Sequence, residues 1–232
     1  MSMQKVYFLS GTMCNNDLWQ FVFPKIKNYS PEYIDITSAT SFEEINQIIN
    51  SKIKSQAILV GFSLGGFCAL NFASQHPEKI KKIISIAASA KGLSENEISL
   101  RKSTIAFLET HRYKGISNTR VKQFLHPDNH KNVTLSNIIK KMDADLGKEV
   151  LIRQLKATSK RIDITTQLKT ITSPILLIGS KEDALVLPQD ILDLKKELKT
   201  SFSVILKNCG HMIPLEKPKE IAEIINNYLN EF

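Results

Sequence analysis

The chain has 232 residues, of which 31 are basic and 23 acidic, and its formal net charge is +8. That length is sufficient for a full hydrophobic core, so we expect one domain with an insertion rather than two independent units. No apolar run approaches the roughly 18 residues that span a bilayer, and no basic stretch is interleaved with stacking aromatics, which argues against a membrane or a nucleic acid as partner.

Short apolar runs alternate along the chain with stretches of helical periodicity. The runs predict strands near residues 5–10, 32–37, 56–61, 82–88, 174–179 and 202–206. The periodic stretches predict helices near 17–28, 42–54, 64–76, 189–199 and 218–230. Such alternation is typical of an α/β fold, in which right-handed crossovers join about six mostly parallel strands and helices cover both faces of the sheet.

Residues 91–170 interrupt this alternation with polar, amphipathic helical pieces. We expect them to form a helical insertion on a core of residues 1–90 and 171–232. The insertion holds 16 basic and 8 acidic residues, whereas the rest of the chain holds 15 of each, so the whole charge excess lies in the insertion. This surface is either a solvated helical face or one that attracts an anionic partner or substrate. If it attracts such a partner, we expect Arg153, Lys156 and Arg161 to contribute to the attraction.

The residues GFSLGG follow the strand-like run AILV and precede a helical stretch that begins at Phe67. A GxSxG pattern in that context predicts a sharp strand-to-helix turn with Ser63 at its apex. Gly61 and Gly65 would remove the Cβ atoms that otherwise collide as the chain reverses. We therefore expect Ser63 to be a nucleophile. A serine is a poor nucleophile at neutral pH, so this interpretation requires a base and a group that orients the base.

Two carboxylates, Glu182 and Asp183, follow the apolar run ILLI, near the expected carboxyl end of a parallel strand, where such sheets bind ligands. Asp183 is our choice for the orienting acid, and Glu182 is the alternative. His211 follows another short apolar run and a glycine, and prolines come close behind it, so we expect a loop to present it as the base. The other four histidines lack such partners.

The order Ser63, Asp183, His211 is that of the α/β-hydrolase superfamily, which the chain resembles over essentially its whole length. The similarity extends to KVYFLSGTMCNNDLW, which resembles the oxyanion loop, and to RIDITTQLKTITSPILLIG, which resembles the approach to the acid strand. The family's usual spacing would place the acid at Glu182. However, the stretch ALVLPQ fits the family better if the acid is Asp183 and one residue has been inserted.

The resemblance implies an oxyanion hole and a lid. Leu64 would supply one backbone N–H of the oxyanion hole. The second would come from Thr12, with Met13 next, in a loop where relatives usually have His-Gly and this chain has Ser10-Gly11. The insertion resembles the helical lid that sets substrate choice in this superfamily. Trp19 and Phe62 are candidate substrate contacts, although such aromatics more often fill the core.

Within the superfamily the chain is most similar to small serine esterases such as the pimeloyl-acyl-carrier-protein methyl ester esterase of biotin synthesis, and to the SHCHC synthase of menaquinone synthesis. This implies a carboxylesterase or thioesterase for a small to medium acyl ester, without metal or organic cofactor, and with acyl carrier protein as a possible partner of the basic lid. The alternatives are a triad-dependent lyase and a binding protein with a silenced site. The three cysteines, Cys14, Cys68 and Cys209, lack metal-ligand spacing and fit a reduced, cytoplasmic protein. We expect Cys14 or Cys209 to confer sensitivity to thiol reagents.

Overall fold

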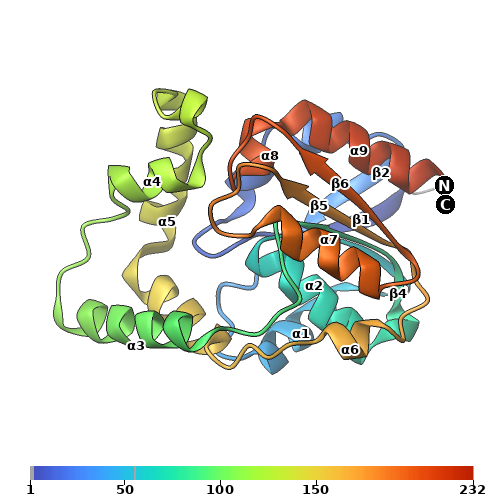
Figure 1. The fold of residues 1–232 in the computed structure, drawn as a ribbon, viewed down its shortest axis with the longest axis horizontal. Coiled ribbons are helices and arrows are strands. Elements are labelled where there is room, and N and C mark those ends of the chain that lie inside the picture. Colours follow the sequence, from blue (N-terminus) through green and yellow to red (C-terminus); the bar gives the residue numbers. More distant parts are fainter. Residues whose placement is uncertain (1–2, 55, 232) are drawn as a thin grey trace.

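The computed structural model describes residues 3–54 and 56–231, and in them parallel strands form one sheet in the order β2-β1-β3-β4-β5-β6. The strands are β1 (Gln4–Leu9), β2 (Tyr29–Tyr33), β3 (Ala57–Phe62), β4 (Ile80–Ile86), β5 (Ile175–Ser180) and β6 (Ser201–Leu206). Their carboxyl ends point toward the helical segment between β4 and β5 (Figure 1). The α/β fold with a six-stranded parallel sheet is confirmed.

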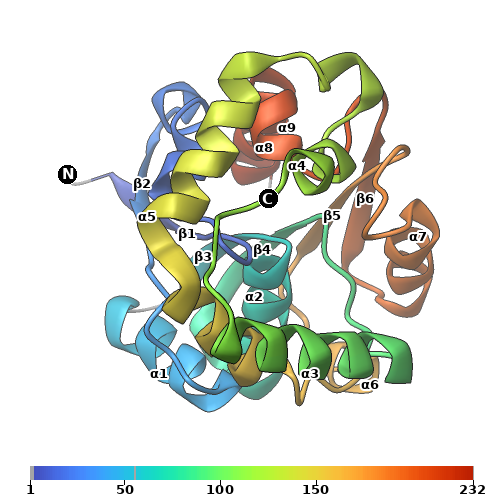
Figure 2. The same ribbon diagram turned by 90° about the vertical axis from the view of Figure 1, so that its left-hand side faces the viewer.

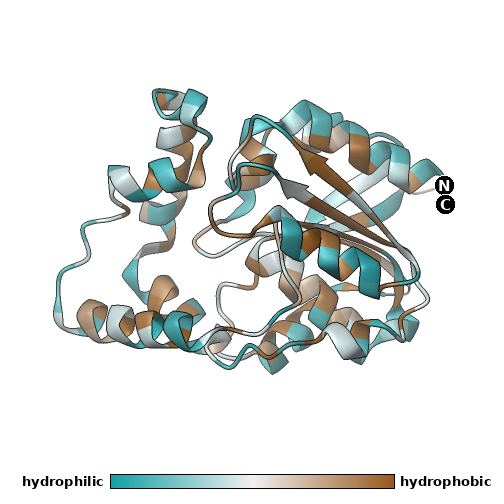
Figure 3. Ribbon diagram, in the orientation of Figure 1, coloured by the Kyte–Doolittle hydropathy of each residue, from teal (hydrophilic) through white to brown (hydrophobic). Residues whose placement is uncertain are grey.

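Helices cover both faces of the sheet because successive strand residues face opposite sides. In β1, Val6 and Phe8 pack with residues of α9 (Pro218–Glu231), while Tyr7 and Leu9 pack on the other face. That second face is covered by α1 (Phe42–Lys52), α2 (Leu64–Gln75), α6 (Thr165–Leu168) and α7 (Pro188–Glu197). The strands are largely hydrophobic, whereas polar residues mark the outer helices (Figure 3).

The helical segment between β4 and β5 contains α3 (Glu95–Thr110), α4 (Asn118–Phe124) and α5 (Val133–Thr158), which face the viewer in Figure 2. Ser94 begins α3 with a reciprocal capping box to Glu97. Gly147 interrupts α5 with φ of 71°, a backbone conformation that favours glycine, and so divides the helix into two halves. By packing, α6 belongs with the core, since Leu168 joins the apolar cluster around α2.

The N-terminal part of the chain departs from the sequence expectation in two places. Residues 17–28 do not form one helix but two short 3-10 helices, η1 (Asn16–Trp19) and η2 (Phe23–Lys25). A continuous α-helix cannot form here, because Pro24 has no backbone N–H to donate and Asn28 adopts a non-helical φ of 64°. The second strand is Tyr29–Tyr33 rather than 32–37. It contains Pro31, which is tolerated because β2 lies at the edge of the sheet.

The other predicted strands and helices agree with the structure to within two residues at each end. No helix in residues 3–54 or 56–231 is long and apolar enough to cross a membrane.

Candidate active site at the carboxyl ends of β3, β5 and β6

Ser63 lies at the sharp turn between β3 and α2, with φ of 52° and ψ of −115°. Its backbone N–H donates to the carbonyl of Ile86 at 2.8 Å, which ties the turn to β4. The turn is possible because a Cβ at Gly61 would lie 2.2 Å from the Gly65 carbonyl oxygen, and a Cβ at Gly65 would lie 2.3 Å from the Leu9 carbonyl oxygen. The predicted role of both glycines therefore has a direct steric basis.

Three side chains from separate strand ends meet at this turn. The Nε2 atom of His211, on the loop after β6, lies 3.1 Å from the Oγ atom of Ser63. The Nδ1 atom of the same ring lies 2.8 Å from the Oδ2 atom of Asp183, on the loop after β5. His211 and Asp183 are only 3% and 4% exposed, so the pair is shielded from water, whereas Ser63 is partly exposed.

The loop after β5 distinguishes the two carboxylates that the sequence offered. The Oδ1 atom of Asp183 accepts the backbone N–H groups of Leu185 at 2.8 Å and Val186 at 3.0 Å, which leaves Oδ2 directed at His211. The carboxylate of Glu182 instead accepts the backbone N–H of Asn208 at 3.0 Å. The geometry thus brings Asp183, and not Glu182, to the histidine.

A residue that the sequence reasoning missed, Glu216 at the end of α8 (Ile213–Glu216), holds the His211 loop. Its Oε1 atom accepts the backbone N–H of Gly210 at 2.8 Å. Its Oε2 atom accepts the N–H of His126 and the side-chain amide of Asn129, each at 2.8 Å. Glu216 therefore joins the loop of His211 to the chain after α4, and no local sequence pattern signals that long-range contact.

The loop after β1 lies against Ser63, since a Cβ at Gly11 would lie 3.1 Å from the Cβ of Ser63. The backbone N–H groups of Thr12 and Leu64 have no hydrogen-bond partner among the residues that the structure describes, and Leu64 is the first residue of α2. The N–H of Met13, the other residue expected to contribute, donates instead to the Oε1 atom of Gln154 at 2.9 Å. Of the three amides expected in an oxyanion hole, only those of Thr12 and Leu64 are thus available.

The two aromatic residues suggested as substrate contacts are buried. Trp19 is 0% exposed, and its indole N–H donates to the Oγ atom of Ser10 at 3.0 Å. Phe62 is 1% exposed, and its ring centroid lies 5.1 Å from that of His211. Neither side chain can contact a substrate unless it moves. Trp19 fills the core, and Phe62 packs beneath the catalytic candidate His211.

A family model described as alpha/beta hydrolase fold matches residues 23–218. The chain belongs to this family. It is also 26% identical to the pimeloyl-[acyl-carrier protein] methyl ester esterase of Wigglesworthia glossinidia brevipalpis, over 97% of this chain and 93% of that protein.

Solved structures show the same fold at low sequence identity. A thermophilic esterase from Thermogutta terrifontis superposes with a TM-score of 0.88 at 16% identity, covering 98% of this chain and 90% of that one. MenH from S. aureus superposes with a TM-score of 0.84 at 18% identity, covering 100% of this chain and 95% of that one. At these identities the likeness concerns the fold alone.

The basic residues selected from the sequence are largely engaged within the alpha/beta hydrolase itself. Arg161 donates to the carbonyls of Ser89 and Lys91, and its guanidinium lies 4.0 Å from the ring centroid of Phe67. Burial lowers its pKa to about 10, so it is still protonated at neutral pH. Lys156 pairs with Glu109 at 2.6 Å. The expectation that Arg161 is a docking residue is wrong, because its charge is turned inward.

Arg153 donates to the carbonyl of Thr37 at 3.1 Å, so this third selected residue also makes a contact within the chain.

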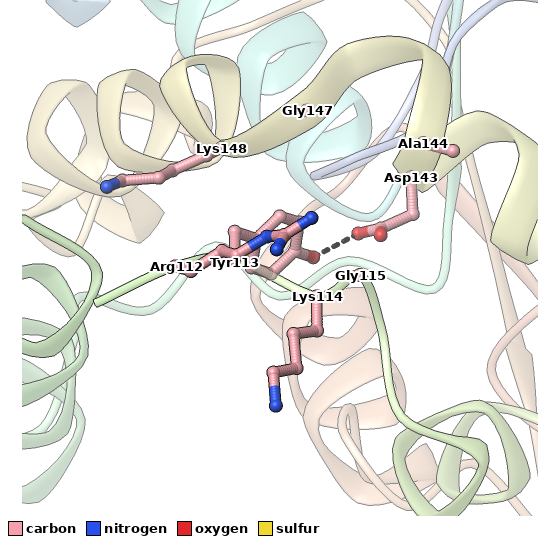
Figure 4. Close-up of a pocket in the computed structure, with 8 residues that line it drawn as sticks. All are labelled: Arg112, Tyr113, Lys114, Gly115, Asp143, Ala144, Gly147 and Lys148. Carbon is pink, nitrogen blue, oxygen red and sulfur yellow. Dashed lines mark hydrogen bonds between the residues drawn. The ribbon is translucent and has the colours of Figure 1, made fainter.

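A different set of cations surrounds an open cavity of about 550 Å³ in the helical segment (Figure 4). Arg112, Lys114 and Lys148 line it. The one carboxylate in its lining, that of Asp143, is only 3% exposed and accepts the hydroxyl of Tyr113 and the backbone N–H of Ile116. The cations therefore dominate the charge that this cavity presents.

Proposed function

We propose that this alpha/beta hydrolase is a serine esterase or thioesterase for a small to medium acyl group. His211 would take the proton of the Ser63 hydroxyl at Nε2, and the alkoxide would attack the carbonyl carbon. The N–H groups of Thr12 and Leu64 would stabilise the oxyanion. Collapse expels the alcohol or thiol, which receives the proton from His211, and a water molecule then hydrolyses the acyl-enzyme by the same route.

The observation that carries this proposal is the continuous hydrogen-bonded line from Ser63 through His211 to Asp183. A buried carboxylate that accepts two backbone N–H groups keeps a fixed orientation, so it can hold one histidine tautomer and stabilise the imidazolium that forms. The partly exposed Ser63 leaves the reacting oxygen open to a substrate.

The test is steady-state hydrolysis of p-nitrophenyl esters with acyl chains of two to twelve carbons. We expect a chain-length optimum in the wild type and a loss of about 10⁴-fold or more in kcat for Ser63→Ala and for His211→Ala. Ser51→Ala, which removes an exposed hydroxyl on α1, should keep wild-type rates. Near-normal turnover by Ser63→Ala would eliminate the mechanism.

As the finer part of the proposal, the substrate is a methyl ester carried on an acyl carrier protein. The named relative from Wigglesworthia and the concentration of charge in the helical segment support this substrate class. A basic docking surface selects an acidic partner, and the cavity lined by Arg112, Lys114 and Lys148 offers such a surface.

Charge reversal separates docking from chemistry. Lys114→Glu with Lys148→Glu should lower kcat/KM for pimeloyl-[acyl-carrier protein] methyl ester by about tenfold at low salt, and less as ionic strength rises, because salt screens these exposed charges. Hydrolysis of a small p-nitrophenyl ester should be unchanged. The matched control, Lys195→Glu with Lys199→Glu, reverses one exposed charge in the last turn of α7 and one just after the helix. Equal losses on both substrates would contradict the docking role.

A further inference from the structure

Gln154, in the second half of α5, links the helical segment to the loop that bears Thr12. Its side chain is buried, with 3% of the residue exposed, and its Oε1 atom accepts the backbone N–H of Met13 at 2.9 Å. Met13 directly follows Thr12, the proposed oxyanion donor, and adopts φ of 54°, which is uncommon for a residue with a side chain. The contact therefore lies one peptide from the proposed site of oxyanion binding.

The turn at Met13 is held from two sides. From within the core, the Oγ atom of Ser10 donates to the carbonyl of Asn15 at 2.9 Å, and the N–H of Cys14 donates to the carbonyl of Gly11 at 3.1 Å. From the helical segment, only the side chain of Gln154 bonds to the backbone of this turn among the described residues. Its position on α5 thus couples the placement of the helical segment to the direction of the Thr12 amide.

The other end of the same side chain is unsatisfied. The Nε2 atom of Gln154 is buried and has no hydrogen-bond partner among the described residues. A buried amide donor is normally paired, and one without a partner calls for an explanation such as a binding role. Because Oε1 is fixed by Met13, Nε2 is held close to the loop that bears Thr12, and, as for Trp19 and Phe62, a substrate atom reaches it only if the side chains around it move.

We propose that Gln154 is a positioning and specificity residue of the acyl site, an inference that rests on the proposed function. Oε1 fixes the turn that directs the Thr12 amide, and Nε2 donates a hydrogen bond to an oxygen of the acyl chain. The preferred acyl groups therefore carry an acceptor oxygen, such as an ether, carbonyl or carboxylate oxygen, in addition to the scissile carbonyl. A site built to pair a polar group discriminates against an analogue that lacks it.

The experiment compares p-nitrophenyl esters that differ by an oxygen in place of a methylene. The pairs are methoxyacetate with butanoate, 3-methoxypropanoate with pentanoate, and 4-methoxybutanoate with hexanoate. Each kcat/KM is divided by the rate of hydroxide hydrolysis of the same ester, which removes the inductive effect of the ether oxygen. We expect the wild type to favour the oxygen-bearing member of at least one pair by about 10- to 100-fold.

Two variants separate the functions of the two ends of the side chain. Gln154→Met has neither polar atom, so it should lose the oxygen preference and lower kcat by about 10- to 100-fold on all esters, because a misdirected amide stabilises the oxyanion poorly. Gln154→Glu keeps an acceptor for the Met13 N–H and has no donor once its carboxyl is ionised, so at a pH above the pKa of that carboxyl it should restore kcat on the plain alkanoyl esters but not the oxygen preference. Gln47→Met, an exposed change on α1, should match the wild type in both measurements.

The inference is overturned if the wild type shows less than a twofold preference in every pair, or if Gln154→Met retains the preference. Thermal unfolding of each variant shows whether it is folded. If Gln154→Met does not fold, the isosteric Gln154→Glu, measured with its carboxyl ionised, decides whether the oxygen preference depends on Nε2. Labelling of Ser63 by a fluorophosphonate tests the proposed function separately, so failure of the Gln154 inference can be told apart from failure of the esterase mechanism. A labelled, active wild type without oxygen preference overturns the inference alone, whereas an unlabelled and inactive wild type overturns both.

Discussion

At the scale of single residues, Ser63 combines an unusual backbone with an open side chain. Its φ of 52° is costly for a residue with a Cβ, by about 1 kcal/mol or more. The cost is met by the surrounding structure, because the N–H of Ser63 is held by Ile86 and the two flanking glycines permit the close approach of α2 to β1 and β3. The result is a hydroxyl presented to His211 at a fixed place.

The cysteines illustrate how burial changes a sequence-based expectation. Burial raises the pKa of Cys14 and of Cys68 to about 12, and that of Cys209 to about 11. The thiolate, which is the reactive form, is therefore scarce at pH 8 in the folded state. We expect native protein to react slowly with a disulfide thiol reagent at pH 8 and to keep its esterase activity, in contrast to the sensitivity expected from the positions of Cys14 and Cys209.

The measurement is the absorbance of the released reporter thiol, with and without denaturant. In denaturant the ordinary pKa of 9.0 returns and all thiols should react within minutes. Because the folded-state pKa values are raised, the contribution of these thiols to stability is present below pH 9 and declines as the pH rises toward 11 and 12. Rapid, stoichiometric reaction of the native protein at pH 8 would be inconsistent with this account.

At the scale of elements, the loop of His211 depends on the chain after α4. Glu216 accepts three hydrogen bonds across this junction, and the N–H of Met212 donates to the carbonyl of Phe124 at 3.1 Å. A Cβ at Gly210 would lie 2.7 Å from backbone atoms of residues 124–126, so the two segments are in close contact. The placement of His211 is therefore set in part by the helical segment.

Glu216→Ala should lower both activity and stability. Three donors lose their acceptor, which should reduce the free energy of unfolding by about 2–4 kcal/mol, and the freed loop should reduce kcat by about tenfold or more. Denaturant unfolding and p-nitrophenyl ester kinetics measure the two effects. Glu220→Ala, which removes only an exposed partner of Lys217, should have neither effect. If both alanine variants behave alike, Glu216 does not hold the loop.

The strand-to-helix turn and the order of Ser63, Asp183 and His211 were predictable because local chemistry determines them. Glycine spacing, an apolar strand and a following helix occur within one short segment. The contacts of Glu216, Gln154 and Arg161 were not predictable, since each joins parts of the chain that are distant in sequence. The short 3-10 helices near Trp19 were missed because an apolar pattern of helical period continued across Pro24.

At the scale of the whole molecule, the helical segment and the sheet share one apolar core. Val121, Leu125, Leu135, Ile139 and Met142 lie in the same cluster as Phe8 and Trp19. The two ends of the segment are also fastened together, because Ile164 donates its N–H to Ala90, Leu93 donates to Arg161, and the Arg161 side chain donates to Ser89 and Lys91. We therefore expect core and segment to unfold in one transition.

Arg161→Met tests this fastening. It leaves two carbonyls without their charged donor, which should lower the free energy of unfolding by about 2–4 kcal/mol while the transition stays single. The free energy of unfolding is measured by circular dichroism and tryptophan fluorescence during denaturation. The fluorescence reports on the shared core, because Trp19 is the single tryptophan of the chain and is buried there. The neighbouring change Lys160→Met is exposed and should be nearly neutral. Two separated transitions in the wild type would contradict a shared core.

The central claim is covalent chemistry at Ser63, and the most direct measurement is incubation with a fluorophosphonate followed by intact mass and peptide mapping. The account predicts one adduct per chain, located on Ser63, with loss of esterase activity in step with labelling, and no adduct in Ser63→Ala or His211→Ala. A folded wild type that turns over substrate without forming the adduct would contradict the account, and would favour a lyase or another reaction that forms no acyl-enzyme.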